Sequence, residues 1–260
     1  MSTHSVDLHR GIRPFQNLPF GGISASTLKI IALLLMLLDH SWATIASNHM
    51  WLTFAGRLAF PIFAFQITEG FLLTSNRKQY AKRLLIFGLL SEIPFNYLVA
   101  ASPIYPFHQN VMITFLLGLW AMTGLEKLRA ERTWRSLIRC VLQILLSLLL
   151  ATILFVDYGS MGVMTVLVFY IFRGFPFAWI GQLLGMTALH IVFFKGYTLL
   201  IPFLGKTIEF PTQGFAVLAL IFIWLYNGKK GRGGKLLQFG CYAFYPLHML
   251  FLYILAVLTR

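Results

Sequence analysis

The sequence predicts an all-α, polytopic membrane protein with about nine transmembrane helices, in a range of roughly eight to ten. Hydrophobic residues make up 58% of the 260-residue chain and charged residues only 11%, with a mean hydropathy of +0.76. A soluble domain of this size does not need so much apolar surface. The apolar residues also form long runs, whereas a β-barrel would show short alternating segments.

Each predicted helix is an apolar run bounded by charged or turn residues. The nine runs cover residues 28–48, 50–73, 82–101, 110–125, 137–156, 160–173, 176–194, 213–226 and 239–258. Residues 195–212 are too short and too interrupted to cross a bilayer, so we interpret them as a loop or a re-entrant segment. Residues 1–27 are polar and are expected to form a cytoplasmic tail, which leaves 28–260 as a single transmembrane domain.

The distribution of basic residues predicts the orientation of the chain in the membrane. Lys and Arg cluster after the second, fourth and eighth runs, Arg173 follows the sixth, and the intervening loops carry few apart from Lys195 and Lys206. The positive-inside rule then places the N-terminus in the cytoplasm. These loops account for the net charge of +13, so no nucleic-acid partner is expected. Two cysteines, Cys140 and Cys241, indicate neither a disulfide nor a metal site.

The first run carries two ionisable residues at a spacing that suggests a functional site. Lys29 and His40 are eleven positions apart, which is about three helical turns and roughly 16 Å along the axis. Both side chains should therefore lie on one face, with the cation at the water boundary and the imidazole near the middle of the membrane. An ionisable group inside a bilayer is by default a candidate functional residue.

Four ionisable side chains from four predicted helices should share one layer of the membrane. His40, Arg57, Glu92 and His248 fall within about 10 Å in depth when rise per residue is counted from the cytoplasmic ends. His40 is the candidate general base; its alternative role is a structural histidine that bonds a neighbouring helix. Arg57 and Glu92 either act in catalysis or form a buried salt bridge between helices. His248, behind the Pro246 kink, is a second site residue or a histidine that bonds a helix.

Three further polar features accompany this layer. Asp39 points about 100° away from His40 and is expected to pair with Arg57, which leaves Glu92 to orient the His40 ring. Asn110 either donates to an oxyanion or caps the fourth helix, and we favour the cap. The run Asn227–Lys235 either cradles phosphates or is an ordinary basic loop.

Several sequence blocks, in order along the chain, resemble the TraX family. They are Leu28–His40, Gly56–Phe71, Ser91–Asn96, Asn110–Gly118, Tyr158–Val163, Tyr226–Gly228 and Phe244–His248. This resemblance implies N-terminal acetylation of conjugative pilin subunits, and the family in turn resembles membrane acyltransferases of the acyltransferase-3 type. A basic residue, ten intervening positions and a histidine mark the first helix of that wider group, and Lys29 and His40 stand at these positions.

The wider resemblance also implies roles for other residues. Lys29 would engage acetyl-CoA and His40 would assist the transfer, with lysine in place of the commoner arginine. Lys82 and Arg83 are placed like an arginine pair of the third helix, and Arg77 is a further candidate for the phosphates. Glu69 stands where a serine is usual.

We therefore expect an integral acetyltransferase of the bacterial cytoplasmic (inner) membrane that uses acetyl-CoA and no metal. The acceptor would be an amine or hydroxyl of an envelope molecule, either a pilin subunit or a glycan, and Arg57 or Asn110 would stabilise the oxyanion. One alternative is a proton-coupled transporter that relays protons through Asp39, Glu69 and Glu92. The other is a non-catalytic assembly factor for a surface filament.

Overall fold

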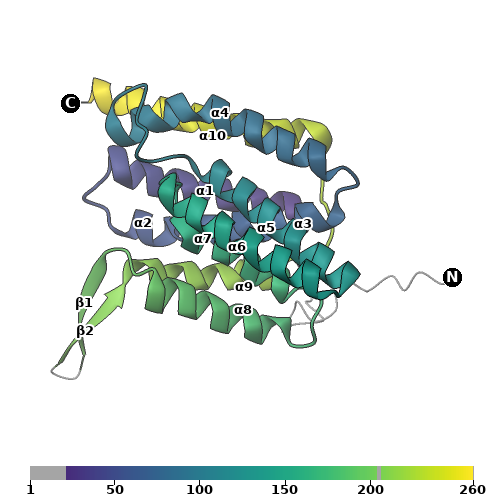
Figure 1. The fold of residues 1–260 in the computed structure, drawn as a ribbon. Helices are drawn as coiled ribbons and strands as arrows, with labels where there is room; N and C mark the ends of the chain where they lie inside the picture. The colour runs from purple at the N-terminus through teal and green to yellow at the C-terminus, as the bar shows by residue number, and fades with distance from the viewer. Residues whose placement is uncertain (1–21, 204–205, 260) are drawn as a thin grey trace.

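The computed structural model describes residues 22–203 and 206–259, and helices dominate this part of the chain (Figure 1). The elements are α1 (Ala25–Thr44), α2 (Trp51–Gly56), α3 (Ala59–Leu73), α4 (Arg77–Ala100), α5 (Val111–Glu131), α6 (Trp134–Ile153), α7 (Gly159–Ile171), α8 (Ala178–Thr187), η1 (Ala188–Phe193), β1 (Thr198–Phe203), β2 (Lys206–Pro211), η2 (Thr212–Leu218), α9 (Ala219–Trp224) and α10 (Gly234–Leu258). Most of the predicted N-terminal tail, residues 1–21, lies outside the described residues.

The predicted all-α membrane fold is confirmed. Among the described residues, five helices are long and apolar enough to cross a membrane, namely α1, α4, α5, α6 and residues Leu236–Leu258 of α10. The other apolar runs form shorter or divided helices, such as α7 and the pairs α2/α3, α8/η1 and η2/α9. A 13-residue helix such as α7 rises only about 20 Å, which is less than a bilayer core. A count of nine crossings therefore stays a prediction.

Residues 195–212 differ from the predicted loop or re-entrant segment. β1 and β2 pair antiparallel from Thr198–Pro211 to Phe203–Lys206, and this hairpin projects from the helical body (Figure 1). The segment contains several Thr, Ile and Phe residues, which favour strands. Because the hairpin stands away from the bundle, both of its faces are largely exposed and the sequence lacks the alternation that a half-buried strand shows.

Local capping explains where several long helices begin. The side chain of Ser24 accepts from the Thr27 backbone N–H at the start of α1, and that of Asn110 accepts from the Met112 N–H at the start of α5. The cap that we favoured for Asn110 is therefore present. Such side chains satisfy amides that have no partner within the helix.

The bundle surrounds α3, most of whose residues from Ala59 to Phe71 are buried. Its main hydrophobic core includes Phe65 of α3, Phe115 of α5 and Phe169 of α7. α4 and α10 run side by side along one outer face, and α1 lies beneath them (Figure 1). A second, smaller core fills the space between α1, α3, α4, α5 and α10; it consists of Met36, Ala59, Phe95, Met112, Tyr245 and Met249.

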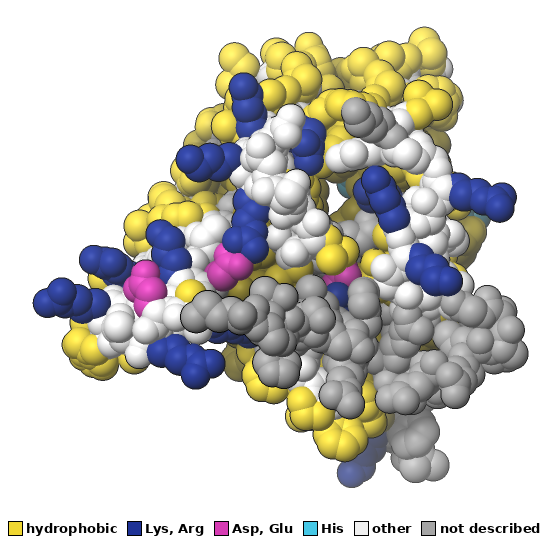
Figure 2. Space-filling view, turned by 90° about the vertical axis from the view of Figure 1, so that its right-hand side faces the viewer, with side chains coloured by type: hydrophobic (Ala, Val, Ile, Leu, Met, Phe, Trp, Pro, Cys, Tyr) yellow, Lys and Arg dark blue, Asp and Glu magenta, His cyan; other side chains and the backbone are white. Residues whose placement is uncertain are grey.

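One end of the molecule is basic. Figure 2 shows this end, where Lys and Arg side chains surround a central hollow. The first residues of α1, α4, α6 and α10 and the last residues of α5 lie here, so the basic loops before α4, α6 and α10 contribute to the same surface.

Candidate active site

α1 and α10 pack against each other, and candidate site residues of the two helices lie opposite one another. Lys29 and Met36 of α1 line a cavity together with Cys241 of α10, and His40 of α1 is hydrogen-bonded to His248 of α10. Lys29, Met36 and His40 follow one another at steps of seven and four residues, which places them on one side of α1. The predicted shared face of Lys29 and His40 is therefore present.

The two histidines form a directed hydrogen-bond chain. Nδ1 of His40 lies 2.7 Å from Nε2 of His248, and Nδ1 of His248 lies 2.8 Å from the carbonyl oxygen of Phe244. A carbonyl only accepts, so Nδ1 of His248 carries a proton and its Nε2, in the neutral ring, accepts the proton of His40 Nδ1. Nε2 of His40 is then left with its lone pair. This is the nitrogen that a general base requires.

A second cluster joins α1 to α2. Asp39 pairs with Arg57 at 3.7 Å, as predicted, and Thr53 bridges the two: its hydroxyl donates to Asp39 at 2.7 Å and accepts from Arg57 at 3.0 Å. Arg57 also contacts the side chain of Tyr158 at the start of α7. Within the described residues, its Nε has no hydrogen-bond partner. The guanidinium is thus held in place with one donor still available.

Glu92 does not orient the ring of His40, because its partner is a different residue. The Asn110 side chain donates a short hydrogen bond to Glu92 and a second one, of 2.8 Å, to the carbonyl oxygen of Gly88. His248 occupies the position that we had predicted for Glu92. Beside this pair, His108 lies 3.5 Å from Asp157, so a polar group surrounds the α4–α5 connection at the end opposite to the basic face.

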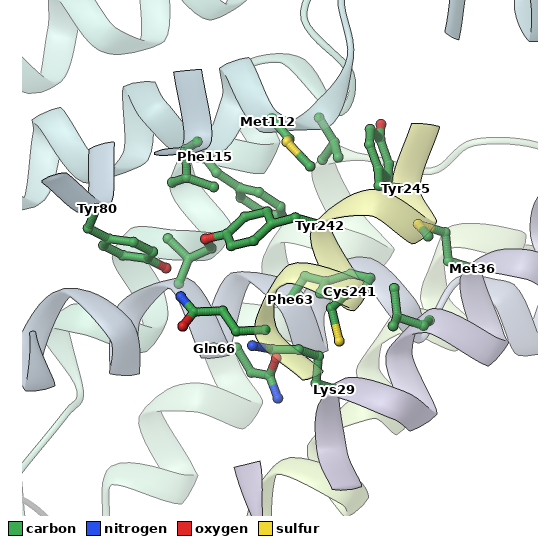
Figure 3. Close-up of a pocket in the computed structure, with 15 residues that line it drawn as sticks. Lys29, Met36, Phe63, Gln66, Tyr80, Met112, Phe115, Cys241, Tyr242 and Tyr245 are labelled. Carbon is green, nitrogen blue, oxygen red and sulfur yellow. The ribbon is translucent and has the colours of Figure 1, made fainter. Parts of the chain in front are cut away.

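A cavity leads from the basic face towards the histidines. Its outer part has a volume of about 450 Å³, and its charged lining residues are Lys29, Glu69, Arg83 and Lys230. Its inner part, of about 110 Å³, is mostly apolar. Figure 3 shows Lys29, Gln66 and Cys241 on one side of the inner part and Met36 and Tyr245 on another.

The inner cavity stops short of the histidine pair. Met36 and Tyr245 line it, whereas His40 and His248 do not. Each histidine follows one of these two residues by about one helical turn, and the rings of Tyr245 and His248 are 5.9 Å apart. In this conformation the inner cavity does not reach His40, and Met36, Met112 and Tyr245 of the second core line its wall.

Of the four basic residues predicted to hold phosphates, the structure places two at the outer cavity and two elsewhere. Lys29 and Arg83 line the outer cavity, but Lys82 is exposed and lines none of the described cavities. Arg77 forms a two-pronged ion pair with Glu126 and lies 4.3 Å above the ring of Phe71. We therefore leave Lys82 and Arg77 out of the site considered below.

The glycine-containing basic loop contributes one cation to the outer cavity. The loop runs beside the start of α1, where the Ala25 N–H donates to the Lys229 carbonyl at 2.9 Å and the Ser26 hydroxyl donates to that of Lys230 at 2.8 Å. This backbone pairing fixes Lys230 at the cavity. The composition of the loop does not show whether it lies near the cavity, and it is the packing against α1 that brings Lys230 there.

A buried ion pair at the outer cavity was missed from the sequence. Glu69 accepts from Arg173 through both of its oxygens, at 2.6 and 2.9 Å, and both residues are buried. We had assigned Arg173 to a cytoplasmic loop because it follows the sixth run. Its partner neutralises the carboxylate of Glu69, so the remaining charge at the cavity is positive.

Comparisons with known proteins agree with the family resemblance. The family model described as TraX protein matches residues 24–256. A probable fimbrial assembly protein FimC, serogroup H1, of Dichelobacter nodosus is 31% identical over 241 residues, which cover 87% of this chain and 93% of that protein. Protein TraX of Escherichia coli is 30% identical over 146 residues, or 55% of this chain and 54% of that protein. No solved structure matches the chain.

Proposed function

The chain belongs to the TraX family, and from this premise we propose that it is an integral-membrane acetyltransferase. It would move an acetyl group from acetyl-CoA to an amine or hydroxyl of an envelope acceptor, either a pilin subunit or a glycan. The similarity to a fimbrial assembly protein and to protein TraX fits a membrane protein with a role related to pili.

The cavity along α1 is the observation that carries this proposal. Its outer part offers the cations Lys29, Arg83 and Lys230, and its inner part is narrow and apolar. A donor that carries phosphates at one end and a long, narrow arm at the other would fit this cavity, with its phosphates at the cationic outer part and its arm in the apolar inner part. The separation of about 16 Å between Lys29 and His40 is comparable to an extended pantetheine arm. Lys29 and Lys230 would hold phosphates, and the thioester would arrive beside His40.

The hydrogen-bonded histidines support a direct transfer. The acceptor enters from the end opposite to the basic face, and its attacking atom gives a proton to Nε2 of His40 as it bonds to the thioester carbonyl carbon. The carbonyl oxygen becomes an oxyanion, for which Arg57 has an available Nε–H donor. When the C–S bond breaks, the thiolate of CoA takes the proton from His40.

The second core must move during such a reaction. Met36, Met112 and Tyr245 separate the inner cavity from the histidines, and the donor arm would displace them. Methionine side chains are unbranched and adapt readily to a new neighbour. A closed state of this kind would also keep water away from the thioester until the donor is bound.

Replacement of His40 tests the catalytic step. Purified protein is incubated with radiolabelled acetyl-CoA and membrane extract, and the labelled product is identified. His40→Ala should lower transfer by about 100-fold or more, since a positioned general base contributes at least that factor. His49→Ala, in the loop after α1, is the matched control and should behave as the unmodified protein. Full activity of the His40→Ala variant would contradict the mechanism.

Protection of Cys241 tests donor binding without any reaction. In a Cys140→Ser background, Cys241 is the only remaining cysteine of the sequence, and it lines the inner cavity beside Lys29. Acetyl-CoA should slow its alkylation, whereas acetate at the same concentration should not. Equal alkylation rates with and without acetyl-CoA would place the donor elsewhere.

The name of one relative favours a second candidate, a non-catalytic assembly factor for a filament. It predicts that His40, Arg57 and Glu92 can all be replaced without effect on filament assembly. The proton-coupled transporter gains less support, because Asp39, Glu69 and Glu92 each have a separate partner, in Arg57, Arg173 and Asn110. Proton flux in liposomes without acetyl-CoA would revive it.

A further inference from the structure

A groove between α4 and α10 opens on the outer face of the bundle. It has a volume of about 560 Å³ and is lined by Gln79, Arg83, Ile86, Phe87, Gln238 and Phe239. The apolar members lie on helices that qualify as membrane spans, and Ile86 and Phe239 are 44% and 52% exposed. Polar side chains gather towards the basic face, since Gln79 and Arg83 come from the first turns of α4.

In this groove, the guanidinium of Arg83 has a hydrogen-bond donor without a partner among the described residues. Its guanidinium lies 5.8 Å from the ring of Tyr80 and contacts the side chain of Tyr242. No acidic residue among residues 22–203 and 206–259 forms an ion pair with it, and its buried Nε has no hydrogen-bond partner there. A buried donor without a partner is unfavourable, and an arginine is well suited to bind a phosphate.

We propose that this groove binds an anionic phospholipid from the membrane leaflet beside the basic face. The phosphate lies against Arg83, with Gln79 and Gln238 as neighbouring polar groups. An acyl chain runs along Ile86, Phe87 and Phe239. The charge of Arg83 selects an anionic headgroup, because basic residues near a membrane surface attract acidic lipids.

The walls of the groove distinguish a lipid from the acetyl-CoA donor. The outer cavity shares Arg83 and Gln238 with the groove, so the phosphate of either molecule is within the reach of this region. The rest of the groove is apolar and faces outward, so contact with it is favourable for a hydrocarbon chain and unfavourable for a nucleotide. The lipid would therefore form a side wall of the outer cavity, while Lys29 and Lys230 remain for the donor.

Lipid retention tests the site and needs no enzymatic readout. The protein is purified from membranes that contain phosphatidylglycerol, washed in detergent, and its bound lipid is counted by mass spectrometry. Arg83→Gln should retain about fivefold less of this lipid, as expected for the loss of one basic contact near a membrane. Lys82→Gln removes the same charge from the neighbouring exposed position and should retain as much as the unmodified protein. Equal loss in both variants, or in neither, would overturn the proposal.

A second pair of variants and a competition experiment complete the test. Phe239→Ala shortens the chain contact and should also reduce retention, whereas Leu236→Ala, at a position 87% exposed and outside the groove, should not. This pair replaces the arginine variant if Arg83→Gln does not fold. Incubation with inorganic phosphate or CoA should leave the lipid bound; its displacement by either would assign Arg83 to the donor. Because retention is measured without transfer, it can fail while the proposed acetyltransferase activity holds, and the reverse.

Discussion

At the level of single residues, the bond between His40 and His248 determines which nitrogen of His40 can take a proton. His248 is itself fixed by the Phe244 carbonyl oxygen, 2.8 Å away, so the direction of the chain originates in the backbone of α10. A side chain at position 248 that accepts a hydrogen bond preserves this arrangement. One that cannot accept leaves the buried N–H of His40 without a partner and frees the ring to change tautomer.

Replacement of His248 should separate these two cases. His248→Phe is expected to lower the rate of acetyl transfer by about 10–100-fold, because an unpaired buried donor costs about 1–3 kcal/mol. His248→Gln offers a carbonyl oxygen to His40 and should retain most of the activity. Transfer rates across a range of pH provide the measurement. If the two variants were equally impaired, the tautomer would not be the contribution of His248.

His108 should give the protein a pH-dependent stability near neutrality. The hydrogen bond to Asp157, opposed by burial, raises the pKa of His108 above its ordinary 6.5. A raised pKa means that the folded state holds the proton more tightly, so this contribution is complete below pH 6.5 and is lost as pH rises through the folded value.

The unfolding midpoint in detergent, measured at several pH values, should show this loss above pH 6.5. His108→Gln should remove that part of the dependence. An unchanged profile in the variant would show that another group is responsible.

Among the elements, the approach of α1 to α2 depends on a single glycine. A Cβ atom at Gly56 would lie 2.3 Å from Cβ and 2.8 Å from Cα of Asp39. The absence of a side chain lets the backbones come close enough for Thr53 and Arg57 to reach Asp39. Gly56 thus positions the charged cluster beside His40.

Gly56→Ala should therefore destabilise the protein by about 1–3 kcal/mol, the usual cost of overpacking. It should also lower acetyl transfer, since the helix pair that places Arg57 is pushed apart. Gly240→Ala in α10 is the matched control, because a Cβ there meets nothing within 4 Å. Thermal unfolding and transfer assays on both variants supply the comparison. Equal stability of the two would mean that the contact at Gly56 relaxes without strain.

The elements also show what could be predicted from the sequence. Every apolar run located by hydropathy contains a helix in the structure. The side chain of Asn110 also marked the start of α5 correctly. The β1–β2 hairpin was not predictable, since neither of its faces packs on a core that would impose an alternating pattern.

Within the site, counting along helices gave the depth of each group but not the rotation of one helix against another. Asp39 and Arg57 are close in sequence, so their pairing could be inferred. The contact of His40 with His248, 208 residues away, depends on how α1 packs on α10. For the same reason Glu92 was assigned a partner that it does not have. The inner cavity and the second core each arise from five helices together, and no segment alone predicts them.

For the whole molecule, the two ends differ in charge, and this asymmetry predicts its orientation. The basic end holds the starts of α1, α4, α6 and α10, whereas α10 finishes at the other end (Figure 1). Positive charges near membrane helices remain in the cytoplasm, so the basic end and the mouth of the outer cavity should face that side. In the proposed mechanism, acetyl-CoA would then be on the correct side to enter, and an envelope acceptor would approach the polar group around Glu92 and His108.

A reporter that is active only outside the cytoplasm tests this orientation. Fused after Arg260, two residues beyond the last residue of α10 in the sequence, it should be active. Fused after Arg132, beyond the end of α5, it should be inactive because that loop belongs to the basic end. The reverse pattern would mean that the protein has the opposite orientation, with the cation-lined cavity on the side that lacks acetyl-CoA. The proposed donor route would then be wrong, even if the histidine pair were catalytic. Activity at both positions would instead require a different number of crossings between α5 and α10.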